Sequence, residues 1–133
     1  MTLEQLLAKL VSIPSPNPAG DTRQIAKFIS DYLGNTFAKL EILSPTEKPE
    51  AQSVVATLGK GKPVIMLHAH IDTVPIGSEE AKRWSSDPYE PTVKDGKLYG
   101  KGSIDDKAPL AAMMWAFKKM AAQTFGGTLV LVA

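Results

Sequence analysis

The sequence has 133 residues, 44% of them hydrophobic, and its 15 lysines and arginines nearly balance its 14 aspartates and glutamates. This length and composition suit one globular domain, and a net charge of +1 argues against nucleic-acid binding. The absence of cysteine excludes disulfides, thiolate metal ligands and a cysteine nucleophile. No apolar run is long enough for a membrane span, and the acidic start is unlike a signal peptide, so we expect a cytoplasmic protein.

The first third of the chain is predicted to hold two helices. Thr2 and Gln5 have the spacing of a capping box, and apolar residues at helical intervals extend this helix towards Pro14. Asp21 can cap a second helix, and Gly34 is a suitable residue to end it.

The rest of the chain is dominated by predicted strands. They cover residues 40–42, 53–58, 63–67, 92–93, 98–99 and 128–133. Two hairpins are expected, one about the turn at 59–62 and one about Asp95-Gly96. A helix from Lys107 to about Gln123 precedes the last strand. Helices before, between and after strands indicate an α/β sandwich with a mixed sheet, in which ligands gather beyond the carboxyl ends of strands.

Two short stretches carry residue types suited to metal binding. His68, His70 and Asp72 alternate after an apolar run expected to be a buried strand, so an extended backbone could turn all three to one side. Asp105 and Asp106 stand on a glycine-rich bend that leads into the long helix. Imidazole and carboxylate are zinc ligands. A lone histidine is more often structural, and paired aspartates can simply cap a helix; together, the two stretches favour one metal site.

The same stretches resemble the motifs of a known enzyme family. Ala69-His70-Ile71-Asp72-Thr73-Val74-Pro75 and Gly100-Lys101-Gly102-Ser103-Ile104-Asp105-Asp106-Lys107-Ala108 are similar to the paired motifs of the dinuclear zinc peptidases and deacylases. This family includes aminoacylase, acetylornithine deacetylase, succinyl-diaminopimelate desuccinylase, carboxypeptidase G and dipeptidases. The resemblance extends to Ser15-Pro16-Asn17-Pro18 and covers essentially the whole chain.

The resemblance implies a fold and a domain organisation. The fold would be a three-layer α/β sandwich with a mixed β-sheet, of the zinc-exopeptidase (phosphorylase/hydrolase-like) type and incomplete. Residues 1–133 would form the N-terminal segment of the metallohydrolase catalytic domain, with the lid domain and the C-terminal catalytic segment absent.

Matching the motifs position by position implies roles for three residues. His70 matches a terminal ligand of one zinc, Asp105 matches the carboxylate that bridges two zincs, and Asp72 matches the catalytic carboxylate that orients the histidine. Two zinc ions, or cobalt in their place, are thus implied. The peptide bond after Asp105 is commonly cis in the family. His68 matches no ligand, and we expect it to be buried and hydrogen-bonded.

The implied activity is metal-dependent hydrolysis of amide bonds in N-acyl amino acids or short peptides. In the family a Glu-Glu pair, which supplies the general base, follows the strand that corresponds to residues 128–133, where this sequence ends. We therefore expect residues 1–133 to be inactive alone, to bind metal weakly and to form homo-oligomers through an uncovered surface. The only Glu-Glu pair, Glu79-Glu80, lies in a polar stretch expected to be solvated, without a catalytic role.

Two alternatives stay open. A barrel amidohydrolase also carries His-x-His after a strand, but that fold needs about 250 residues and more than the two histidines present. A non-catalytic, truncated metal-binding or structural module would account for the missing base.

Overall fold

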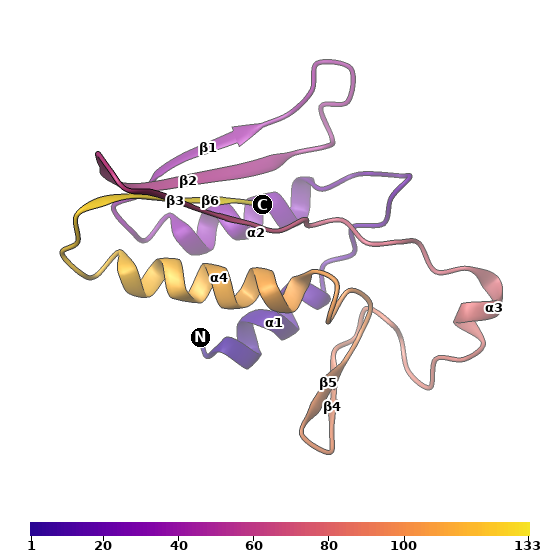
Figure 1. Cartoon of the computed structure of the whole chain (residues 1–133). Helices are drawn as coiled ribbons and strands as arrows, with labels where there is room; N and C mark the ends of the chain where they lie inside the picture. Colours follow the sequence, from indigo (N-terminus) through magenta and orange to yellow (C-terminus); the bar gives the residue numbers. More distant parts are fainter.

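The computed structural model describes residues 1–133 and shows a mixed α/β arrangement (Figure 1). The elements in chain order are α1 (Leu3–Val11), α2 (Arg23–Leu33), β1 (Lys39–Leu43), β2 (Ser53–Lys60), β3 (Val64–His68), α3 (Ser78–Ala81), β4 (Thr92–Lys94), β5 (Lys97–Tyr99), α4 (Lys107–Met120) and β6 (Gly127–Val132). No helix combines the length and the apolar character needed to cross a membrane.

The predicted helix starts are partly confirmed. At α1 the Thr2 hydroxyl accepts a hydrogen bond from the Gln5 amide at 3.2 Å, and the Gln5 side chain accepts one from the Thr2 amide at 2.9 Å, which completes the capping box. At α2 the N-cap position belongs to Thr22, while the predicted cap, Asp21, lies one residue earlier and its carboxylate accepts a hydrogen bond from the Arg23 amide at 3.1 Å. The Thr22 hydroxyl does not cap the helix, because it donates to the Gln52 carbonyl at 2.7 Å. This bond ties the start of α2 to the residue before β2.

The main sheet has the strand order β1-β2-β6-β3. β6 pairs antiparallel with β2 and parallel with β3, so it lies between two strands that are consecutive in the sequence. The prediction that β2 and β3 form a hairpin is therefore wrong. After α4 the chain returns and places β6 between β2 and β3. β6 then forms hydrogen-bonded ladders with both strands, whereas a β2–β3 hairpin would contain only one ladder.

The helices α1, α2 and α4 lie on one side of the main sheet (Figure 1). Apolar residues of β2 and β6 that point to that side are buried with them in a single core. The opposite face of the sheet carries no helix and presents Val55, Thr57, Val130 and Val132, which are only partly buried. The predicted α/β fold with a mixed sheet is confirmed, with its helices on one face within these residues.

β3 was expected to be buried, and this expectation is wrong. β3 is the edge strand, and Val64 and Met66 are 59% and 62% exposed. The apolar run of β3 suits a central strand, but only one edge of this strand is paired, with β6.

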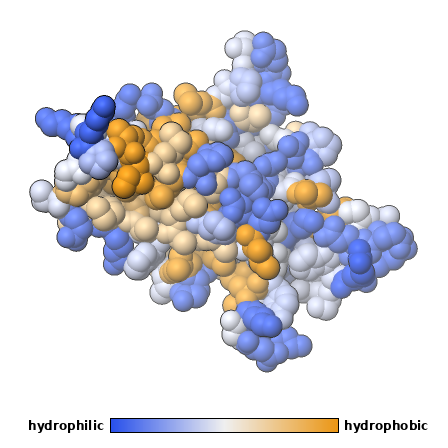
Figure 2. All heavy atoms as spheres, in the orientation of Figure 1, coloured by the Kyte–Doolittle hydropathy of each residue, from blue (hydrophilic) through white to orange (hydrophobic).

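Figure 2 shows apolar atoms gathered over the half of the molecule that holds the sheet and α4, whereas the half around α3 is mostly hydrophilic.

The second predicted hairpin is confirmed. β4 and β5 pair antiparallel about a two-residue turn in which Asp95 and Gly96 have φ values of 51° and 71°. Two positive φ angles define the turn type that Asp-Gly favours. This hairpin forms its own two-stranded sheet, separate from the main one.

Candidate metal centre

Two segments distant in the sequence meet at the carboxyl end of β3. His70 and Asp72 follow this strand directly, and Asp105 stands on the bend that precedes α4. The Nε2 atom of His70 lies 2.9 Å from the Oδ1 atom of Asp105, across 35 residues of sequence. The structure thus brings together the imidazole and the carboxylate that the sequence placed in one site.

The His70 ring is held from both sides. Its Nδ1 atom lies 3.0 Å from the Asp72 carbonyl oxygen and 3.3 Å from the Asp72 carboxylate. A carbonyl oxygen can only accept, so Nδ1 carries a proton and donates it. Burial lowers the pKa of His70, but the hydrogen bonds to Asp105 and Asp72 and their negative charges outweigh it, and the net pKa is raised.

The bend that carries Asp105 requires a glycine. Gly102 has a φ of 76°, and a Cβ atom there would lie 2.6 Å from the Cγ2 atom of Thr73. The peptide bond between Asp105 and Asp106 is cis, as the family resemblance implied. Asp106 occupies the N-cap position of α4 without a side-chain capping bond, and the Asp105 side chain is 85% exposed. Simple helix capping by the paired aspartates is therefore not what the structure shows.

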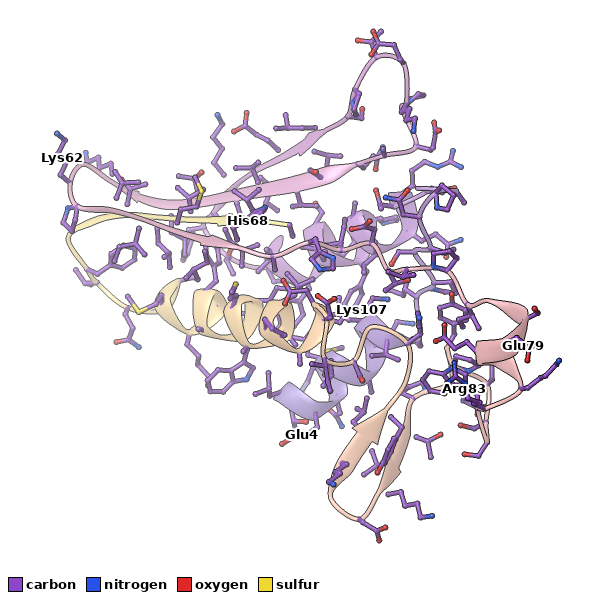
Figure 3. The ribbon with its side chains drawn as sticks, turned by 45° about the vertical axis from the view of Figure 1, so that its right-hand side comes forward. Glu4, Lys62, His68, Glu79, Arg83 and Lys107 are labelled. Atoms are coloured by element: carbon purple, nitrogen blue, oxygen red, sulfur yellow. The ribbon has the colours of Figure 1, made fainter.

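His68 does not join this cluster. It ends β3 with its side chain exposed, so the expectation of a buried, hydrogen-bonded residue is wrong. The reason is that His68 lies opposite Val132 on the face of the sheet that no helix covers, and that β3 is also an edge strand. Figure 3 shows His68 on β3, with Lys107 at the first turn of α4. His68 lines a hollow of about 650 Å³ that also borders His70 and Asp72.

A second hollow, of about 320 Å³, is also lined by His70 and Asp72, together with Asp105 and Glu80. The Glu80 carboxylate accepts a hydrogen bond from the Lys101 ammonium at 2.8 Å, which holds the pKa of Glu80 below its ordinary value. Sequence reasoning placed both loop glutamates in solvent, but Glu80 is partly buried.

Its neighbour behaves as expected. Glu79 is exposed and pairs with Lys82 at 2.6 Å, and it lies on the short helix α3, away from the sheet (Figure 3). Nowhere in the chain do three or more His, Asp or Glu side chains form a metal-binding group.

Sequence reasoning gave no role to two residues that support the site. Lys107 is fully buried, and its ammonium donates to the Ile13 carbonyl at 2.8 Å; burial lowers its pKa to about 8. Asn17 donates from its side-chain amide to the Asp72 carboxylate at 2.9 Å. Both residues belong to stretches that resemble family motifs. This resemblance was the only feature of the sequence that could have indicated their contacts.

Comparison with known proteins identifies the family. Residues 66–133 match the model described as Peptidase family M20/M25/M40. The chain is 42% identical over 85 residues to the succinyl-diaminopimelate desuccinylase of Xanthomonas euvesicatoria pv. vesicatoria, covering 62% of this chain and 22% of that protein. It is 30% identical over 129 residues to the enzyme of the same name from Parvibaculum lavamentivorans, covering 96% of this chain and 32% of that protein.

Solved structures share the fold. Human carnosine dipeptidase 1 superposes with a TM-score of 0.80 at 25% identity, covering 98% of this chain and 31% of that one. A dinuclear metal-binding peptidase of Bacillus subtilis superposes with a TM-score of 0.60 at 21% identity, covering 98% and 33%. The chain therefore spans about a third or less of the length of these relatives. By the match of residues 66–133, the chain belongs to peptidase family M20/M25/M40.

Proposed function

We propose that residues 1–133 supply half of the active site of a hydrolase that cleaves amide bonds in N-acyl amino acids or short peptides. The observation that carries this proposal is the 2.9 Å approach of His70 to Asp105, with Asp72 behind the imidazole. The names of the relatives, desuccinylases and a dipeptidase, support the amide bond as the target. On this proposal the residues form the N-terminal segment of a catalytic domain whose lid and remaining catalytic residues lie elsewhere.

The two donor atoms fit a divalent metal. Ligands bonded to zinc at about 2.0–2.1 Å in a tetrahedron are roughly 3.3 Å apart. The His70 and Asp105 atoms are 2.9 Å apart at an accessible edge of the molecule, so the two side chains would separate slightly to hold the ion. His70 and Asp105 would hold zinc, or cobalt in its place. The bound cation supplies Lewis-acid polarisation of the scissile carbonyl.

The protein's own contribution is orientation. The Asp72 carbonyl oxygen and carboxylate both face Nδ1 of His70, so they keep the proton on that nitrogen and leave Nε2 directed towards Asp105. A carboxylate behind a histidine ligand also increases the basicity of the ring. The site is thereby arranged to present one imidazole and one carboxylate to the same point.

Cobalt titration followed by visible absorption tests the site. His70→Ala and Asp105→Asn should abolish the signal, whereas His68→Ala, which removes the neighbouring exposed histidine, should retain it. Equal loss in all three variants would show that a different set of ligands binds the metal.

A non-catalytic metal-binding module is the second candidate. It is favoured by the absence of a group of three or more acidic or histidine side chains that could hold a metal, and by the pairing of Glu79 and Glu80 with lysines.

A complementation experiment separates the two candidates. Residues 1–133 would be mixed with the Parvibaculum desuccinylase from which the matching region has been deleted. If the mixture regains desuccinylase turnover and His70→Ala removes it, the hydrolase is supported. If the mixture is soluble but shows no turnover, the non-catalytic module is supported.

We further propose that copies of these residues associate through the uncovered sheet face and the open edge of β3. The support is the exposure of Val64 and Met66, at 59% and 62%, on a strand with one unpaired edge.

A cytoplasmic location is also proposed, because a chain without cysteine needs no oxidising compartment to fold. Cell fractionation checks this location.

A further inference from the structure

A short segment before the second helix lies against the loop that carries His70 and Asp72. Pro16 and Thr73 form an isolated parallel bridge. The Asn17 amide donates to the Thr73 carbonyl at 2.9 Å, and the Thr73 amide donates to the Ser15 carbonyl at 2.8 Å. These bonds join parts of the chain more than fifty residues apart.

The same segment also secures the residue on the other side of Asp72. The fully buried Ser15 donates from its hydroxyl to the Ile71 carbonyl at 2.6 Å. The backbone on both sides of Asp72 is therefore bonded to the segment. The Asp72 carbonyl itself faces Nδ1 of His70 at 3.0 Å.

Asn17 acts on the side chain as well. Its amide nitrogen donates to Oδ2 of Asp72 at 2.9 Å, while Oδ1 of the same carboxylate lies 3.3 Å from Nδ1 of His70. One carboxylate oxygen is thus held by Asn17 and the other faces the imidazole. A partly exposed carboxylate such as Asp72 would rotate among its rotamers without such a partner.

We propose that Asn17 is a positioning residue for the metal site, acting through Asp72 on His70. It holds the Asp72 carboxylate in the rotamer that faces Nδ1, which keeps the proton on that nitrogen and presents Nε2 towards Asp105. This inference rests on the proposed function only for its consequence, which is metal affinity. The arrangement itself is a property of the metal-free protein.

The test compares Asn17→Ala with Asn17→Asp, which has nearly the same shape but replaces the amide donor with an acceptor. Asn35→Ala is the matched control, because Asn35 is also exposed and lines neither of the two hollows beside His70. Nitrogen-detected NMR of the histidine rings reads the tautomer of the neutral form directly. The chain has two histidines, so His68 serves as an internal reference.

Asp105 can accept a proton from Nε2, whereas Asp72 can accept one from Nδ1. We therefore expect both Asn17 variants to shift the neutral His70 ring towards the Nε2–H tautomer, and to weaken cobalt binding by roughly tenfold, the lower end of the effect of residues behind a ligand. Asn17→Asp should be at least as damaging as Asn17→Ala, because a carboxylate cannot donate to Asp72 and carries the same charge. If Asn17 only filled space, aspartate would preserve its role and Asn17→Asp would behave like the wild type. His68 signals, thermal midpoints and the Asn35→Ala variant should be unchanged.

An unchanged His70 tautomer in both folded Asn17 variants overturns the positioning role. If the wild-type chain binds no cobalt through His70 but the tautomer still depends on Asn17, the positioning role stands and the proposed function fails. The two failures are therefore distinguishable in one set of samples.

Discussion

Lys107→Met should stabilise the protein at neutral pH. Lys107 begins α4 with its side chain fully buried, and its ammonium donates one hydrogen bond, to the Ile13 carbonyl at 2.8 Å. No carboxylate forms an ion pair with it. A buried cation with a single carbonyl partner carries a desolvation penalty that one hydrogen bond does not offset. Methionine has a similar length and shape and carries no charge.

The pKa gives the size of the effect. Burial lowers the pKa of Lys107 from 10.5 to about 8, which corresponds to about 3 kcal/mol of unfavourable free energy for the charged form at neutral pH. The lost hydrogen bond removes about 1 kcal/mol of stabilisation. The variant should therefore be more stable by about 2 kcal/mol, a large fraction of the stability of a domain of this size.

The sign of the pH dependence follows from the same pKa. Between about pH 8 and 10.5 the unfolded chain binds more protons at Lys107 than the folded protein does. The stability of the wild type should therefore rise with pH across this window, whereas below it the penalty is fully present. The advantage of Lys107→Met should shrink by about pH 10, because the wild-type lysine is then largely neutral when folded.

Urea unfolding followed by circular dichroism at about pH 7 and about pH 10 measures both effects. Lys9→Met is the control, because Lys9 lies exposed on α1, and a surface substitution should change stability by about 0.5 kcal/mol or less. A Lys107→Met variant that is destabilised equally at both pH values would refute the reasoning. It would show that the bond to Ile13 outweighs the burial of the charge.

Three further outcomes are expected. Because the pKa of His70 is raised, cobalt binding should weaken as pH falls, with a midpoint above the ordinary value of 6.5. In the metal-free protein the stabilisation from the His70–Asp105 contact is fully present below pH 6.5 and is lost as pH rises through the raised pKa, so Asp105→Asn should flatten the pH profile of stability. Residues 1–133 loaded with zinc should not hydrolyse acyl-amino acids or dipeptides above background. Turnover that Glu80→Gln removes would show that Glu80 has a catalytic role despite its ion pair with Lys101. Sedimentation at tens of micromolar should show oligomers that Met66→Lys dissociates, and a strictly monomeric wild type would disprove association through β3.

Features that depend on neighbouring residues could be predicted from the sequence. The capping box joins Thr2 to Gln5, and the Asp95-Gly96 turn closes a hairpin between adjacent strands. The pairing of His70 with Asp105 was also anticipated, although the residues are 35 apart. In that case the motif resemblance supplied the long-range information that local patterns lack.

Features that depend on where distant strands and loops pack could not be predicted in the same way. The apolar run of β3 is compatible with a buried strand, and only the insertion of β6 made β3 an edge and left His68 exposed. The bonds of Asn17 to Asp72 and of Lys107 to Ile13 span 55 and 94 residues. By itself the sequence determined the local elements and the candidate ligands, because turn chemistry, capping and side-chain type act over a few residues. Only the tertiary structure decided which strand became the edge and which side chains support His70, because those outcomes depend on how the whole chain packs.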